Sequence, residues 1–320
     1  MSTATLSLIG NSTTRLTTAS TAGGRSQGGA VLVVGRLVVA DTARMVVAGA
    51  STTGDDSGGG AVAAGSLSLQ GQGLEVTRAT TAGVNSPGGA VLVFGEATVA
   101  GDAVVAVSLA STSGERSPGG AVCFLGAASV SGNASLVADD CHTGGENSPG
   151  GALFADTTLS VDNESVVSVT NSSTMGTSSG GGALAVTGAL TLADTGAVRL
   201  ASSSTTGAQS PGGAVLALGL VDVAGAARLE VAVASTAGSG SHGGGLAGTT
   251  LRAPGRVTVE DSETTGDNSP GGGVYLDMLN LTGSGTLSIA GSSTAGNFSG
   301  GGGLRAGRFA ADGGVLVVER

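Results

Sequence analysis

One nine-residue motif, Thr-x-Gly-x-x-Ser-x-Gly-Gly, occurs ten times in the chain, and this repetition constrains the fold more than any other feature. The first copy begins at Thr21 and the last at Thr294, and the copies between them are almost evenly spaced. A fixed period of about 30 residues is the signature of a repeat architecture such as a solenoid or a propeller. Each unit must therefore bury its apolar side chains against its neighbours.

Each unit contains three short patches in which apolar residues alternate at i and i+2, the period of a β-strand. In the unit that starts at Ala90 the apolar pairs are Val91 and Val93, Ala97 and Val99, and Val105 and Val107. Propeller blades have four strands in about 40 residues and carry aromatic signatures, whereas this chain has no Trp and one Tyr. We therefore predict an all-β fold, a right-handed parallel β-helix of 10–11 coils with three short strands per coil.

The repeats extend over nearly the whole chain, so we predict a single β-helix domain comprising residues 1–320. We expect it to be a fragment of a longer chain with neighbouring domains, because solenoid ends need caps and neither end has a recognisable polar cap. The predicted coils start near residues 30, 61, 90, 121, 152, 183, 214, 245, 273 and 303.

The charge and hydropathy of the chain limit the classes of partner that it can bind. The net charge is -10 and all 13 basic residues are arginines scattered singly along the chain, which excludes a polyanion-binding patch for nucleic acid. No run approaches the roughly 18 apolar residues of a membrane-spanning helix. The N-terminus also lacks the basic region and apolar core of a signal peptide.

The repeated motif itself is predicted to form the turn between the third strand of one coil and the first strand of the next. Glycine supplies the positive φ angles that a tight corner requires. The hydroxyl groups are predicted to form hydrogen-bonded ladders between coils. The residues expected in this turn ladder include Thr52, Thr112, Thr143, Thr174, Thr205, Ser57, Ser86, Ser117, Ser148 and Ser210.

Two ligand-binding interpretations of the motif are disfavoured. A phosphate-binding glycine loop follows a strand, opens a helix and in its Walker form contains a lysine, whereas these glycines precede a strand and the chain has no lysine. An ice-binding face needs regular threonine ranks, and the second rank here is interrupted by Ala22, Gly144 and Met175. We therefore predict no cofactor.

The densest group of reactive side chains is Asp139-Asp140-Cys141-His142. Neighbouring coils offer no carboxylates at matching positions, so we interpret this segment as a solvated turn and predict no catalytic or metal-binding residues. The two cysteines, Cys123 and Cys141, are interpreted as small apolar residues with free thiols, although their proximity in the sequence leaves a disulfide open.

The first strand of many coils is apolar on both faces, which exceeds what a solenoid core demands. If alternate residues fill the core, an apolar stripe points away from it, formed by Leu32, Leu92, Cys123, Phe154, Leu216 and Tyr275. Exposed apolar stripes require cover. Two interpretations stay open: either the Thr-to-Ser corner folds over the stripe, or the stripe is a lateral docking surface for a protein or glycan partner.

The recurring tetrapeptide Gly-Gly-Ala-[Val/Leu], as in Gly88–Val91 and Gly150–Leu153, resembles the repeat of the chlamydial polymorphic outer membrane proteins and related pectin-lyase-like surface repeats. The resemblance implies an extracellular or cell-surface β-helix with an adhesive role. We therefore expect a non-enzymatic structural or adhesin-like rod. The alternative is a polysaccharide lyase-like or hydrolase-like β-helix, which the uniform coil length disfavours.

Overall fold

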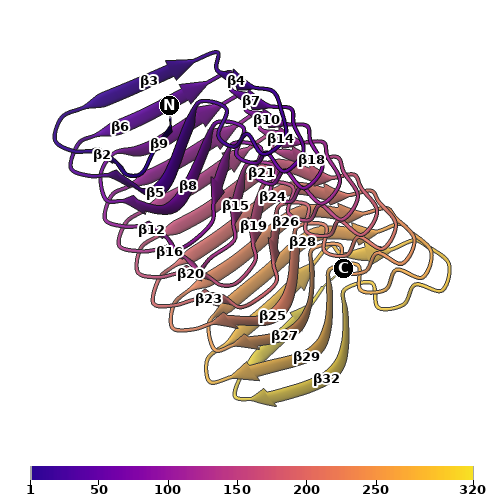
Figure 1. The fold of residues 1–320 in the computed structure, drawn as a ribbon. Helices are drawn as coiled ribbons and strands as arrows, with labels where there is room; N and C mark the ends of the chain where they lie inside the picture. Colours follow the sequence, from indigo (N-terminus) through magenta and orange to yellow (C-terminus); the bar gives the residue numbers. More distant parts are fainter. Residues whose placement is uncertain (1, 320) are drawn as a thin grey trace.

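The computed structural model describes residues 2–319, and its chain winds through about ten coils whose strands stack into two parallel sheets (Figure 1). No helix occurs among these residues. The N-terminal strands lie at one end of the stack and the C-terminal strands at the other, so the molecule is a rod built along one axis (Figure 1). The predicted all-β parallel solenoid is confirmed.

The first sheet, here called sheet A, collects the first two predicted strands of every coil, which merge into one long strand in several coils. Its strands are β1 (Ser2–Thr3), β2 (Leu6–Leu8), β5 (Val31–Val39), β8 (Val62–Leu69), β11 (Val91–Val93), β12 (Ala97–Val99), β15 (Val122–Phe124), β16 (Ala128–Val130), β19 (Leu153–Ala155), β20 (Leu159–Val161), β22 (Leu184–Val186), β23 (Leu190–Leu192), β25 (Val215–Val223), β27 (Leu246–Ala253), β29 (Val274–Thr282) and β32 (Leu304–Asp312).

The second sheet, sheet B, collects the third predicted strand of each coil and a short extension of it. Its strands are β3 (Thr13–Thr17), β4 (Ser20–Thr21), β6 (Arg44–Ala48), β7 (Ser51–Thr52), β9 (Gly73–Thr77), β10 (Thr80–Thr81), β13 (Val104–Ser108), β14 (Ser111–Thr112), β17 (Ser135–Asp139), β18 (His142–Thr143), β21 (Val166–Thr174), β24 (Ala197–Thr205), β26 (Arg228–Thr236), β28 (Arg256–Thr264), β30 (Thr286–Ala290), β31 (Ser293–Thr294) and β33 (Val315–Val318).

The core lies between the two sheets and consists of columns of aliphatic side chains stacked in register. Val91 pairs with Val62 on one side and with Val122 on the other, and all three are buried. The six residues predicted as inward in the coil from Ala90 are buried as well, with 2% or less of their surface exposed. The period-2 pattern therefore predicted the core correctly.

The turn formed by the motif begins later than the sequence predicts, because the motif threonine still belongs to a strand. Thr112 ends β14, so the chain is still extended at this residue and the turn begins after it. Between β13 and β14, Leu109 adopts a left-handed conformation with a φ of 56°. The equivalent residues of the two neighbouring coils, Arg78 and Asp140, do the same. One left-handed residue per coil thus bends the strand that the periodicity predicts as its third, adding a fourth short segment.

Hydroxyl groups of the motif link all the corners. In each coil the threonine hydroxyl donates to the carbonyl of the serine five residues later, as Thr143 does to Ser148 at 2.7 Å. At every step from Ser26 to Ser299, the serine N–H donates to the serine Oγ of the next coil at 2.8–3.0 Å. Buried hydroxyl groups and amides are thereby satisfied inside the rod.

Two different constraints require glycine at the three glycine positions of the motif. Gly119 has a φ of 72°, which favours glycine. The following Gly120 has no such angle, but an added Cβ would lie 2.1 Å from the Gly151 carbonyl oxygen of the next coil. At Gly114 an added Cβ would lie 1.8 Å from the Gly83 oxygen of the previous coil. Glycine is therefore required at one position by its positive φ and at the other two by the close approach of stacked backbones.

Candidate functional site

The predicted apolar stripe forms its own small cluster outside the main core. Its register column runs through ten coils and contains Leu32, Ala63, Leu92, Cys123, Phe154, Ala185, Leu216, Ala247, Tyr275 and Arg305. Leu92, Cys123 and Phe154 are 1%, 0% and 7% exposed. Leu32, Leu216 and Tyr275 are half-buried. The stripe points away from the core, yet solvent scarcely reaches its centre.

The corners cover the stripe. A Cβ added at Gly58 would lie 2.6 Å from Leu92 Cδ2, and one added at Gly180 would lie 2.8 Å from Leu216 Cδ2. At the same motif position His242 packs its ring 4.0 Å from the ring of Tyr275, and burial lowers the pKa of this histidine. The residue between the serine and the glycine pair therefore lies over the stripe residue of the next coil. Of the two interpretations, the structure favours the covering corner.

The cluster Asp139-Asp140-Cys141-His142 is not a simple solvated turn. Asp139 ends β17, His142 begins β18, and Cys141 points into the core with no exposed surface. Burial raises the pKa of the Cys141 thiol to about 12 and raises that of the Cys123 thiol as well. Both thiols are free. Asp140 is left-handed with a φ of 54°, which shifts the alternation by one residue, so that Cys141 rather than Asp140 faces the core. The solvated-turn prediction was therefore wrong for Cys141, whereas its interpretation as a small apolar residue with a free thiol is confirmed.

The outward side chains of this segment form a hydrogen-bonded chain. His142 Nε2 lies 2.8 Å from Asp140 Oδ1, and its Nδ1 lies 2.9 Å from Ser173 Oγ on the neighbouring strand. This arrangement orients the imidazole, as a general base requires. The histidine and aspartate side chains are 38% and 47% exposed, however, so water competes for both hydrogen bonds. No group of three or more His, Cys, Asp or Glu within residues 2–319 is arranged to hold a metal ion.

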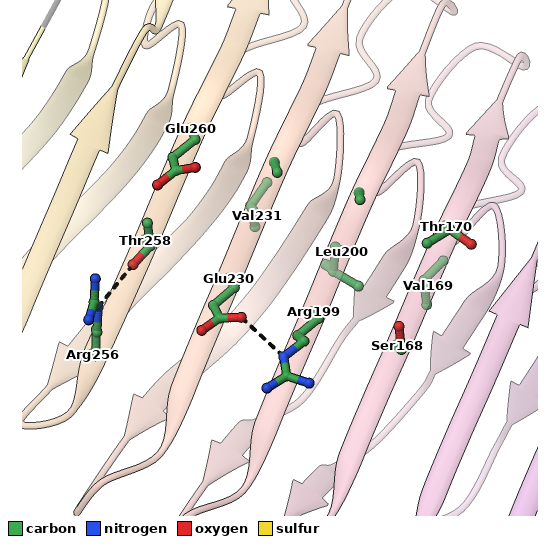
Figure 2. Close-up of a pocket in the computed structure, with 12 residues that line it drawn as sticks. Ser168, Val169, Thr170, Arg199, Leu200, Glu230, Val231, Arg256, Thr258 and Glu260 are labelled. Carbon is green, nitrogen blue, oxygen red and sulfur yellow. Dashed lines mark hydrogen bonds and ion pairs between the residues drawn. The ribbon is translucent and has the colours of Figure 1, made fainter.

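The outer face of sheet B contains a surface depression, here called the sheet-B groove (Figure 2). The groove has a volume of about 350 Å³ and crosses the four neighbouring strands β21, β24, β26 and β28. Its floor is a row of register partners on successive strands: Ser168, Arg199, Glu230 and Thr258. Because parallel strands are about 4.8 Å apart, the row brings together side chains that lie a whole coil apart in the sequence.

Charged side chains of both signs line the sheet-B groove. Arg199 Nε lies 3.1 Å from Glu230 Oε2, and Arg256 Nε donates to Thr258 Oγ1 at 3.4 Å (Figure 2). Glu260 adds a second carboxylate at the groove margin. Ion pairs this exposed contribute about 0–1 kcal/mol to stability, so these side chains can exchange their partners for a ligand at little cost. The groove is suited to a polar ligand that both accepts and donates hydrogen bonds.

The sequence interpretation missed this groove. Arg199 and Glu230 depart from the repeat, since the coils directly before and after them place Ser168 and Thr258 in the same column. Aligning the units by their motif would have placed Arg199 beside Glu230. The available signal was therefore a local loss of repetition on the outward positions of the third strand.

Comparison with known proteins identifies no relative: no family model, curated protein or solved structure matches the chain. The structure is consistent with a pectin-lyase-like β-helix as an architecture. The resemblance of the Gly-Gly-Ala tetrapeptide to the chlamydial surface repeats stays an interpretation of the sequence. Among residues 2–319 there is also no helix with the length and apolarity to cross a membrane.

Proposed function

We propose that the chain is a structural, adhesin-like rod at the cell surface or outside the cell, which presents the sheet-B groove to a protein or glycan partner. The observation that carries the proposal is a groove lined by charged side chains on one lateral face of a regular scaffold. Ladders of backbone and serine hydrogen bonds hold every coil to the next, whereas the groove concentrates Arg199, Glu230 and Arg256 on one lateral face.

The proposal assigns the partner surface to the sheet-B groove instead of the apolar stripe. Leu92 and its neighbours in the apolar stripe are covered by the corners, so they offer little area to a second molecule. The groove side chains are solvent-accessible, and both signs of charge lie within reach of one ligand. Complementary charges of this kind contribute more to specificity and association rate than to raw affinity.

A polysaccharide lyase or hydrolase is the second candidate function. The observation that favours it is the placement of a guanidinium, Arg256, and a carboxylate, Glu260, on one strand, β28, along the groove. Acid–base cleavage of a glycan requires side chains that donate and accept protons beside the scissile bond. The uniform coil length favours the rod, because within residues 2–319 no long loop builds walls around the groove.

A binding screen combined with a cleavage assay tests the proposal. The purified chain is applied to a glycan array and to intact cells, alongside Arg199→Ala and Glu230→Gln. Arg116→Gln is the control, since Arg116 is an exposed corner residue whose equivalent in another coil is Gln209. We expect binding that the groove variants reduce and the control retains, with no shortening of the glycan. If the chain cleaves a glycan and Glu260→Gln abolishes the cleavage, the enzyme is the correct function and the rod is refuted. If no groove variant alters binding, the assignment of the partner surface to the sheet-B groove is refuted.

A further inference from the structure

One corner between sheet A and sheet B is shorter than the corners on either side of it. Register pairs Asp222 with Arg252 and Asn280 at the end of sheet A, and pairs Arg228 with Arg256 and Thr286 at the start of sheet B. In the first of these three coils, the five residues 223–227 join the end of sheet A to the start of sheet B. In the third coil, the five residues 281–285 do so. The coil between them has only three, 253–255.

The missing residues open a depression of about 200 Å³, here called the short-corner notch. Pro254 and Gly255 form its floor, and the longer corners of the two neighbouring coils form its walls. Backbone hydrogen bonds hold the short corner on both sides: Gly255 N–H donates to Val223 O at 2.6 Å, and Thr286 N–H donates to Gly255 O at 2.9 Å. The notch is therefore a fixed part of the coil stack.

Two arginines line the short-corner notch from adjacent strands. Arg228 and Arg256 are register partners and both are exposed. Like charges directly opposite each other on neighbouring strands destabilise a sheet. Neither guanidinium belongs to any of the four ion pairs found among residues 2–319. Glu230, the nearest carboxylate along β26, is 3.1 Å from Arg199 instead.

We propose that the short-corner notch is a binding site for a tetrahedral oxyanion, a phosphate or sulfate group, held between Arg228 and Arg256. Guanidinium groups match the oxygens of such anions with paired, charge-assisted hydrogen bonds. Ser284 and Thr286 on the opposite wall carry hydroxyl groups that donate to the remaining oxygens. The anion relieves the repulsion between the two arginines, although the net charge of the whole protein is -10. This site goes beyond the proposed function. It shares Arg256 with the sheet-B groove, whereas Arg228 lines the notch alone, so Arg228→Gln tests the notch separately from the proposed function.

Titration of the unaltered chain tests the site directly. Isothermal calorimetry with inorganic phosphate and with inorganic sulfate, at an ionic strength held constant with chloride, should show saturable binding. A phosphorylated and a sulfated monosaccharide in parallel titrations distinguish a free anion from a group carried on a sugar. In the same protein, bound anion should protect Arg228 and Arg256 from the arginine reagent phenylglyoxal, as read by peptide mass spectrometry. Equal heats with chloride alone, or no protection, would overturn the proposal.

Three variants separate a built site from general charge attraction. Arg228→Gln and Arg256→Gln should each weaken binding about tenfold or more, because each removes charge-assisted hydrogen bonds. Arg116→Gln changes the net charge equally and should bind as the parent does. Replacing Pro254-Gly255 with the sequence of residues 224–227 keeps both arginines but restores the longer corner, and should abolish binding. The proposal fails if the control loses as much affinity as the notch variants, or if the restored corner binds unchanged.

Discussion

Replacing Ser148 with alanine should destabilise the rod by about 2–4 kcal/mol. The Ser148 hydroxyl accepts the N–H of Ser117 at 2.9 Å. Its one hydrogen is within reach of two carbonyl oxygens, those of Glu146 at 3.1 Å and Gly114 at 3.2 Å. Ser148 and Ser117 are fully buried, so no water replaces the lost oxygen. A buried amide left without an acceptor costs about 1–3 kcal/mol, and the carbonyl that loses its donor adds a smaller amount.

Guanidinium chloride unfolding measures the Ser148→Ala effect, and it is followed by far-UV circular dichroism because the chain has no Trp and one Tyr. The matched control is Ser113→Ala, an exposed serine of the neighbouring corner, for which we expect a change within about 0.5 kcal/mol. Since coils of a solenoid can unfold separately, hydrogen exchange should also show a faster Ser117 amide in the variant. Equal unfolding midpoints for the two variants, with unchanged exchange at Ser117, would refute the assigned role of the ladder.

Three further substitutions or reagents test the corners and the core. Gly89→Ala places a Cβ 2.0 Å from the Gly120 oxygen and should destabilise by about 1–3 kcal/mol or more, whereas Gly300→Ala meets no atom within 4 Å and should leave the unfolding midpoint nearly unchanged. Val233 is 56% exposed with a φ of 52°, so Val233→Asn should raise the free energy of unfolding by about 1 kcal/mol. A lower unfolding midpoint for this variant would contradict the expectation. The raised pKa of the Cys141 thiol, about 12, keeps it neutral below that pH, so a thiol reagent at pH 8 should react only after unfolding, and rapid labelling of the folded chain would count against its burial.

The fold could be predicted from the sequence because its determinants recur in every coil. Val91, Val93 and their equivalents carry the period-2 signal of a strand, and the motif returns with each coil. What the periodicity does not contain is the path of the chain between strands. The corner at Gly58 covers Leu92 because it folds back over the sheet. The alternation of apolar residues in the strand would be the same if the corner did not fold back.

The candidate sites were harder to predict for a different physical reason. Arg199 and Glu230 lie in successive coils and become neighbours only through the register of stacked strands. Each is unremarkable within its own unit, where an outward charged residue is ordinary surface. The short corner at Pro254 was visible as the reduced spacing between the motif serines Ser241 and Ser269. Its consequence, a notch between two longer corners, appears only when three coils are compared at once.

The serine ladder also determines how such a protein can change in length. Each coil accepts a hydrogen bond from the serine N–H of the coil before it and donates one to the coil after it. Removing residues 121–151 would therefore join Gly120 to Ala152 and leave equivalent donors and acceptors facing each other. Duplicating the same segment would lengthen the rod by one strand spacing, about 4.8 Å. Recombination between repeats can thus set the reach of the rod in whole coils, while the side chains of any one groove stay as they are.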